Sequence, residues 1–398
     1  MNTVYDSFQE NLKSIELFFD RLVPLALSQD ETIIKETSEL MKNSIIEELG
    51  IDPNEVNSED FKAQLKANVT KKQLEKFIYR IMKIPKIPPR NYDILTRSSF
   101  ISLNNYFECL FSDLLNFYFK NYPGLITEKK ISISISDLTK YGAIDEAKED
   151  LIQREIEKIC LDLNFEELKD YFRSKLEVPL EEKIIDWEKI NEIRERRHII
   201  VHNNSIINKK YINRSKNPYN LKEGDQVNID EKYFYDSLEA IKLSGSLLIF
   251  NCWGKWDKIN ATKAIEQIML LTFDNLKDRH FDFVKKICEY AKLNIKPKND
   301  DEENYMLRIL YNYCIALKRL GEHKKLNLNL KKIKVGTLAP IFKIAQAILS
   351  DDYDEYFENL KKAQMADDLS MDIIMDWPLF EDIRTNPEYL KKTESILT

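Results

Sequence analysis

The chain has 398 residues and a formal net charge of −7, with 43% hydrophobic and 32% charged residues. It contains 8 glycines and 12 prolines, which excludes collagen-like and low-complexity chains and argues against a turn-rich all-β fold. No apolar run reaches the ~18 residues of a membrane span, and the first residues lack a signal-peptide pattern. The five cysteines include no CxxC pair, which indicates a reducing compartment. We therefore expect an all-α, cytoplasmic protein with no membrane partner.

The first 90 residues predict an N-terminal helical region. Apolar residues recur every three or four positions through much of 8–49, the period of an amphipathic helix. Gly50 suits a helix C-cap, and Pro53 suits the start of the next helix. Three prolines within 84–90 (IPKIPPR) remove backbone donors and favour extended geometry, so we place a linker there.

Residues 91–256 predict a second helical domain. An apolar stripe runs along 96–122 and is ended by Pro123-Gly124. The segment ISISIS at 131–136 alternates apolar and polar residues, which predicts one isolated strand. Further helices are expected at 145–163, 165–176, 181–202 and 230–250. A polar loop is expected between the last two.

Residues 257–398 predict a C-terminal helical-repeat region. Paired helical patterns with short turns follow a charged break at 294–304, an arrangement typical of solenoid arrays. The expected helices cover 305–320, 338–349 and 353–364. The segment DWPLF at 376–380 resembles the end of tetratricopeptide-like arrays, and this resemblance implies that it covers the last apolar face.

The polar chemistry of the chain concentrates between residues 186 and 216. Eight basic residues stand there against four acidic ones, and two of the four histidines fall in the same stretch. The net charge of the whole chain does not indicate nucleic-acid binding, but the distribution of charge is more informative than its sum.

The run RHIIVH from Arg197 to His202 resembles the signature of the HEPN superfamily (higher eukaryotes and prokaryotes nucleotide-binding). That signature is an arginine, a polar residue, three mostly apolar residues and a histidine at the end of a helix. The following Asn203 and, downstream, Tyr211 also resemble bacterial members. The resemblance covers residues 91–256, and it implies an all-α fold in which a HEPN-like helical bundle lies between the N-terminal region and the tetratricopeptide-like region.

This resemblance implies a metal-independent endoribonuclease with Arg197 and His202 as catalytic residues. Histidine can take the proton of the RNA 2′-hydroxyl or donate one to the leaving 5′-oxygen, and arginine can bind the phosphate through two N–H groups. On an ideal helix the two residues lie about 140° apart. In HEPN nucleases two protomers pair and line one cleft with both motifs, so the resemblance implies a homodimer.

Several other residues are candidates for supporting roles. His198 could orient the phosphate or only form a hydrogen bond, and Asn203 could hold the phosphate or cap the helix, with Asn204, in left-handed geometry. The long helix at 96–122 resembles the HEPN element that carries an acidic residue, and we expect Glu108 to be a buried group paired with an arginine of the motif helix. Arg194 and its neighbour Arg196 could contact RNA or form a solvated face. Lys209, Lys210 and Arg214 predict a positive rim for an RNA backbone.

The expected partners are therefore RNA and a second copy of the chain, with no cofactor. By resemblance to bacterial relatives, the protein is expected to be a toxin or a phage-defence effector of the abortive-infection type, with an antitoxin or a phage-derived trigger as a further partner. Two alternatives stay open: a non-catalytic scaffold, and a metal-dependent hydrolase that uses His198 and His202. The second lacks the glutamate of an HExxH motif and an evident third ligand, so no metal is expected.

Overall fold

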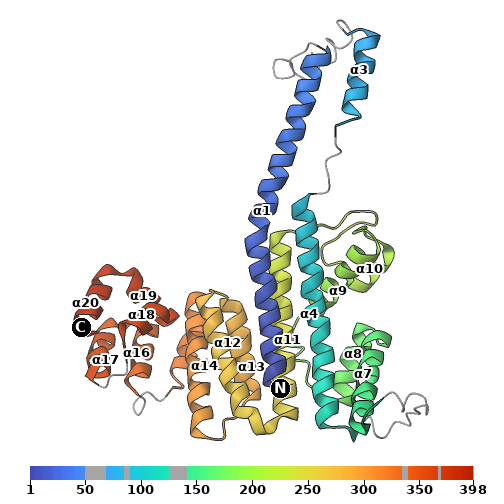
Figure 1. The fold of residues 1–398 in the computed structure, drawn as a ribbon. Helices are drawn as coiled ribbons and strands as arrows, with labels where there is room; N and C mark the ends of the chain where they lie inside the picture. Colours follow the sequence, from blue (N-terminus) through green and yellow to red (C-terminus); the bar gives the residue numbers. More distant parts are fainter. Residues whose placement is uncertain (50–68, 85–89, 125–140, 334–338, 366–368, 398) are drawn as a thin grey trace. The chain divides into compact units, whose positions relative to one another are not determined.

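The computed structural model describes residues 1–49, 69–84, 90–124, 141–333, 339–365 and 369–397. In this part of the chain there are seventeen α-helices and no β-strand, and one isolated bridge joins Ile206 to Gln226 (Figure 1). The all-α class is therefore confirmed. The expected helix cap at Gly50, the helix start at Pro53, most of the proline linker and the ISISIS strand lie outside the described residues.

The described chain forms two compact units, each assembled from separate stretches of sequence. The first unit combines Met1–Ser7, Leu110–Trp187 and Glu239–Thr398, and the second combines Phe8–Cys109 and Glu188–Leu238. The domain boundaries expected after residues 90 and 256 stay predictions.

The second unit is built around three long helices. They are α1 (Asn2–Leu49), α4 (Asn91–Asn121) and α11 (Glu231–Trp256), and one end of each belongs to the first unit. Phe19 of α1 is fully buried and stacks on Phe234 of α11 with 3.8 Å between ring centroids. The buried carboxylate of Asp30 accepts the backbone N–H groups of Asn91 and Tyr92, which satisfies two open donors at the start of α4.

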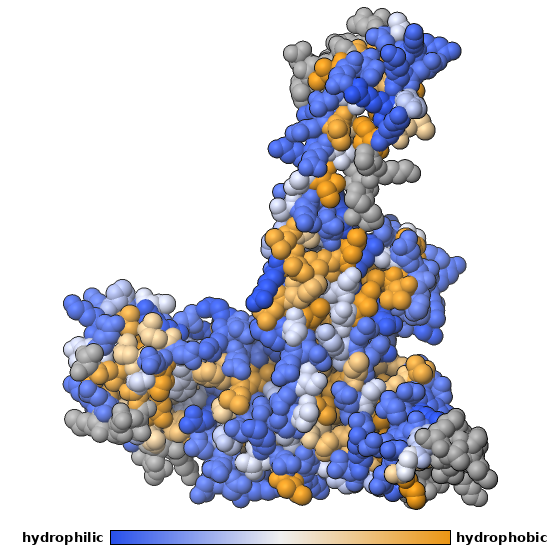
Figure 2. Space-filling view, in the orientation of Figure 1, coloured by the Kyte–Doolittle hydropathy of each residue, from blue (hydrophilic) through white to orange (hydrophobic). Residues whose placement is uncertain are grey.

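Three shorter helices complete this unit: α3 (Lys71–Ile81), α9 (Trp187–His202) and α10 (Lys209–Ser215). Apolar side chains remain exposed along α1 and α3, among them Leu25, Ile34 and Tyr79. Figure 2 shows apolar side chains at the surface along the upper part of α1.

The first unit holds α7 (Ile144–Asp162), α8 (Phe165–Asp170) and a π-helical turn (Tyr171–Lys175), and then the C-terminal helices. The latter are α12 (Ala261–Lys277), α13 (Phe281–Asn294), α14 (Asp300–Arg319), α15 (His323–Leu330), α16 (Pro340–Leu349), α17 (Tyr353–Met365), α18 (Met371–Asp376), a 3-10 turn (Pro378–Phe380), α19 (Glu381–Thr385) and α20 (Pro387–Leu397). Helices α12, α13 and α14 pack against one another, and α16 packs on α17 and α14. Small residues lie at these contacts, since Ala316, Ala345 and Ala347 are fully buried.

Two expected boundaries in the motif region are wrong. The helix expected from residue 181 begins at Trp187, because Glu181 has a φ of 45°, which a right-handed helix cannot contain. The polar loop expected after His202 contains α10, whose first turn is capped when the Asn208 side chain accepts the N–H of Tyr211.

The charged break expected at 294–304 is also shorter than predicted. Helix α14 begins at Asp300, where the Asn299 side chain accepts the N–H of Glu302. Four acidic residues occupy its first turn, where the positive end of the helix dipole favours them. The charges therefore mark the start of a helix.

Candidate functional site

Helix α9 carries the motif and has two contrasting faces. Its inner face buries Ile193 and Ile199, which are at most 1% exposed. Its outer face presents Arg197 and His198 as half-buried side chains and His202 as an exposed one. The last two turns of α9 therefore direct the predicted catalytic residues away from the core.

A buried ionic network fixes the inner face of α9. The Glu192 carboxylate, 0% exposed, accepts the Nε–H of Arg196 at 2.7 Å and the hydroxyls of Tyr211 at 2.6 Å and Tyr233 at 2.5 Å. The Arg196 guanidinium lies 3.8 Å from the Tyr233 ring centroid and 4.9 Å from that of Tyr219, which is cation–π geometry. The network ties α9 to α10 and α11. The sequence-based expectation that Arg196 forms part of a solvated face or contacts RNA is wrong, because its side chain is buried.

The charges of this network are stable near neutral pH. Burial, together with the nearby Glu192 carboxylate, raises the pKa of the Tyr211 and Tyr233 hydroxyls above its ordinary value. Burial opposes the charge of Arg196, but the Glu192 carboxylate, which accepts its Nε–H, opposes this effect, and the Arg196 pKa is raised. Both tyrosines therefore remain hydrogen-bond donors and the arginine remains charged, so we interpret the network as structural.

The end of α9 is a tight left-handed turn. The N–H groups of Asn203 and Ser205 both donate to the carbonyl of Ile199, at 2.9 and 3.0 Å. Asn204 and Ser205 have φ values of 48° and 63°, the conformation that commonly ends helices. The Nδ2 group of Asn203 donates to the carbonyl of Ile206 at 2.5 Å. The side-chain amide of Asn203 therefore helps to close the turn, as the capping alternative expects, but the left-handed residues are Asn204 and Ser205 and do not include Asn203.

Arg197 is held by side chains of α4. Its Nη2 lies 3.2 Å from Asn105 Oδ1 and 3.7 Å from Glu108 Oε2. Arg194, one turn earlier on α9, places its Nη1 3.3 Å from Glu108 Oε1. The expected pairing of Glu108 with an arginine of the motif helix is therefore present. The expected burial of Glu108 is wrong, because its side chain is 38% exposed.

The guanidinium of Arg197 keeps an unused donor. Its Nε–H is buried and has no hydrogen-bond partner within the described residues. The whole side chain is 26% exposed, so solvent reaches part of it. The guanidinium is held on one side by α4, and the exposed part of the side chain lies outside the buried Nε–H.

The two histidines of the motif lie next to each other, with their rings tilted by 47°, on the other side of the outer face. Their ring centroids lie 4.7 Å apart, as expected for positions i and i+4. Burial lowers the pKa of His198, and the charges of His202, Lys210 and Arg214 lower it further, while Glu195 opposes them. His198 is therefore predominantly neutral at pH 7, with a nitrogen lone pair able to accept a proton.

Helix α10 supplies the positive groups near His198. Lys209 and Lys210 are exposed, and neither forms an ion pair within the described chain. Arg214 pairs with Glu195 at 3.6 Å, and its carbonyl accepts the Asn191 amide at 2.7 Å. The three residues predicted to form a positive rim, Lys209, Lys210 and Arg214, therefore lie on one short helix, α10.

The arginine and the second histidine of the motif do not meet within one chain. Arg197 makes its contacts with α4, whereas His202 contacts the His198 ring, which lies among charges from α10. Val201 lies between them on the helical wheel and is 44% exposed. Helix α9 therefore presents the two groups at opposite edges of the same outer face.

Sequence reasoning missed two residues that shape this site. Asn105 contacts Arg197 and lies three positions before Glu108, hence on the same face of α4. Glu192 lies four positions before Arg196, a spacing that brings opposite charges together on a helix. The sequence spacing alone could have indicated both residues, but it does not show that the Glu192–Arg196 pair is buried.

No group of three or more His, Cys, Asp or Glu residues in the described part of the chain is arranged to hold a metal ion. None of the described helices combines the length and hydrophobicity needed to cross a membrane. None of the five cysteines, all of which lie in the described residues, forms a disulfide bond. No protein-family model, curated protein or solved structure matches this chain.

Proposed function

We propose that the protein is a metal-independent endoribonuclease of the HEPN type. The observation that carries the proposal is the contact of Arg197 with Glu108 and Asn105. The RHIIVH run identified the arginine, and the HEPN resemblance separately pointed to an acidic residue on the preceding long helix. Their meeting at a partly exposed surface supports a shared site.

The proposed chemistry uses the RNA 2′-hydroxyl as the nucleophile. A histidine removes its proton, the 2′-oxygen bonds to phosphorus, the bond to the 5′-oxygen breaks, and a second proton donor protonates the leaving oxygen. The products are a 2′,3′-cyclic phosphate and a 5′-hydroxyl. Arg197 binds the phosphate oxygens as negative charge develops on them.

The two histidines suit different steps of this reaction. The lowered pKa of His198 favours the neutral imidazole that a general base needs. His202 is the exposed histidine at the end of α9, where it can reach the leaving group. We assign proton donation to His202 and a supporting, proton-accepting role to His198.

A second copy of the chain would complete the site. Within one protomer Arg197 and His202 lie at opposite edges of the outer face, with exposed Val201 between them. Two such faces packed around a two-fold axis would set the arginine of one chain near the histidine of the other. We therefore propose that the active form is a homodimer with the scissile phosphate in the groove between the subunits.

The proposed RNA path follows α10. Lys209 and Lys210 are exposed cations that can attract a phosphate backbone, and Arg214 extends this rim despite its partner Glu195. An RNA phosphate would have to compete with Glu108 for Arg194. We therefore assign the first backbone contacts to the lysines and a later contact to Arg194.

Cleavage of RNA in the presence of EDTA tests the proposal. The wild-type protein should cut a mixed-sequence RNA, and Arg197→Ala and His202→Ala should each lower the rate by roughly 100-fold or more. His323→Ala is the matched control, because His323 is an exposed histidine on another helix. Unchanged activity in both motif variants would refute the assignment, and no cleavage of any RNA would favour the scaffold.

We further propose that cleavage serves a toxin or phage-defence role, with an antitoxin or phage-derived trigger as regulator. Expression in a bacterial host should then arrest growth, because uncontrolled RNA cleavage stops translation. His202→Ala should restore growth at equal protein level, and His323→Ala should not. Equal arrest by the His202 variant would contradict this role.

A further inference from the structure

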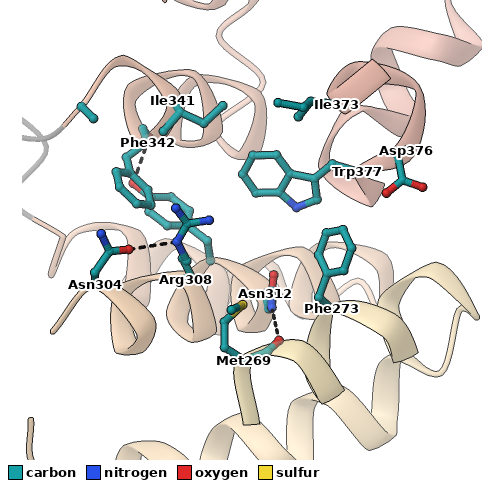
Figure 3. Close-up of a pocket in the computed structure, with 12 residues that line it drawn as sticks. Met269, Phe273, Asn304, Arg308, Asn312, Ile341, Phe342, Ile373, Asp376 and Trp377 are labelled. Carbon is teal, nitrogen blue, oxygen red and sulfur yellow. Dashed lines mark hydrogen bonds between the residues drawn. The ribbon is translucent and has the colours of Figure 1, made fainter. Parts of the chain in front are cut away.

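A cavity lies among the C-terminal helices of the first unit. Its volume is about 500 Å³, within the range of small-molecule sites. It is formed by α12, α14, α16 and α18 with the residue after α18 (Figure 3). The lining residues are Met269, Phe273, Asn304, Arg308, Tyr311, Asn312, Ala339, Ile341, Phe342, Ile373, Asp376 and Trp377.

The walls of this cavity are aromatic and partly fixed in place. Tyr311 is 1% exposed, donates its hydroxyl to the Phe342 carbonyl at 2.9 Å, and stacks on the Phe342 ring with centroids 5.5 Å apart. Trp377 and Phe273 extend into the space from the opposite side (Figure 3). Flat apolar surfaces on more than one side favour a flat ligand, because stacking buries the most area against them.

The polar groups of the cavity are few and differ in availability. The exposed guanidinium of Arg308 donates through Nε to Asn304 Oδ1 at 2.9 Å, and it pairs with no carboxylate in the described chain. Asp376 is engaged, since its carboxylate binds Lys277 at 2.5 Å. The Trp377 indole N–H is buried and has no hydrogen-bond partner there.

We propose that this cavity binds a small, flat aromatic molecule that carries one anionic group. The ring stacks among Trp377, Phe273 and Phe342, and the anion, a phosphate or a carboxylate, binds Arg308 at the rim. Arg308 lies over the Phe342 ring at 5.9 Å, and its hydrogen bond to Asn304 uses Nε, so among the described residues its two Nη groups can offer parallel N–H donors to either anion. A ring nitrogen or carbonyl would supply the acceptor that the Trp377 N–H lacks. The site shares no residue with the proposed nuclease site, so either proposal can fail without the other.

Titration calorimetry with the full-length protein tests this proposal. Adenosine 5′-monophosphate and indole-3-acetate are the probes for the phosphate and carboxylate arms, and adenosine, indole and inorganic phosphate are their incomplete counterparts. At least one charged ring should bind about tenfold or more tightly than its uncharged ring and than phosphate alone. The arm that binds identifies the anion.

Two substitutions locate the binding. Arg308→Gln should weaken binding of the charged ring by about tenfold, and Lys391→Gln, which removes an exposed charge on α20 outside the cavity, should leave it unchanged. Trp377→Leu should weaken the charged and uncharged rings alike, with circular dichroism as the check on folding. No saturable binding of either charged ring at about 10 mM, or equal binding by Arg308→Gln, would overturn the proposal.

Discussion

Replacing Glu192 by glutamine tests the buried network that supports the motif helix. The substitution keeps the size of the side chain and removes its negative charge. In the native protein that charge faces Arg196 at 2.7 Å and accepts two tyrosine hydroxyls, all within a group that is 0% exposed. The variant leaves the Arg196 charge buried without its counter-ion.

The size of the effect follows from the cost of an uncompensated buried charge. Breaking a buried ion pair by removing one partner costs about 3–5 kcal/mol. Glutamine can still accept some of the three hydrogen bonds, so we expect the lower end, about 3 kcal/mol. Since 1.4 kcal/mol is a factor of ten, amide protection in this region should fall by roughly 100-fold.

Hydrogen–deuterium exchange of peptides that cover α9, α10 and the start of α11 measures this effect. A local probe is needed because a chain with two compact units need not unfold in one step. The matched control is Glu188→Gln, one turn earlier on α9, whose 72% exposed carboxylate pairs with Lys216. Surface substitutions of this kind change stability by about 0.5 kcal/mol at most. A loss of protection in Glu192→Gln no larger than in the control would refute the role of the network.

Two further predictions concern the outer face of α9. Lys210→Gln should raise the His198 pKa, because it removes a positive charge that disfavours the imidazolium; NMR titration measures this, and Lys209→Gln should have less effect. Because folding lowers the His198 pKa from 6.5, stability is lost as the pH falls from 6.5 to the folded-state value, and Lys210→Gln should reduce that loss. Val201→Asp should weaken the proposed homodimer at least tenfold, as measured by analytical ultracentrifugation. The control Ile259→Asp, at a position that is 97% exposed, should leave dimerisation unchanged. Equal dimerisation of both variants would contradict the proposed interface.

Sequence periodicity was sufficient where a helix buries one regular face. The helix expected at 145–163 is α7 (Ile144–Asp162), and that expected at 353–364 is α17 (Tyr353–Met365). It was insufficient for α10, which has seven residues, too few to show a repeating pattern. Buried Tyr211 anchors this helix through Glu192, a contact between distant segments that no local pattern encodes.

The sequence predicted which residues belong to the candidate site better than it predicted the contacts that they make. The motif identified Arg197 and His202, and the resemblance pointed to Glu108. Charge spacing alone could not separate Arg196, which is 6% exposed, from Arg197, because adjacent helical positions point about 100° apart and either could face the core. The burial of Arg196 depends on Tyr233, a residue of another helix.

Cleavage of one RNA sequence and its all-2′-deoxy counterpart, in EDTA, separates attack by the 2′-hydroxyl from every other route. The wild-type protein should cut the RNA, leave a 2′,3′-cyclic phosphate and a 5′-hydroxyl, and spare the deoxy strand. Arg197→Ala and His202→Ala should lose this cleavage together, since both groups act on one phosphate. Cleavage of the deoxy strand, a requirement for a metal ion, or full activity in either variant would contradict the account.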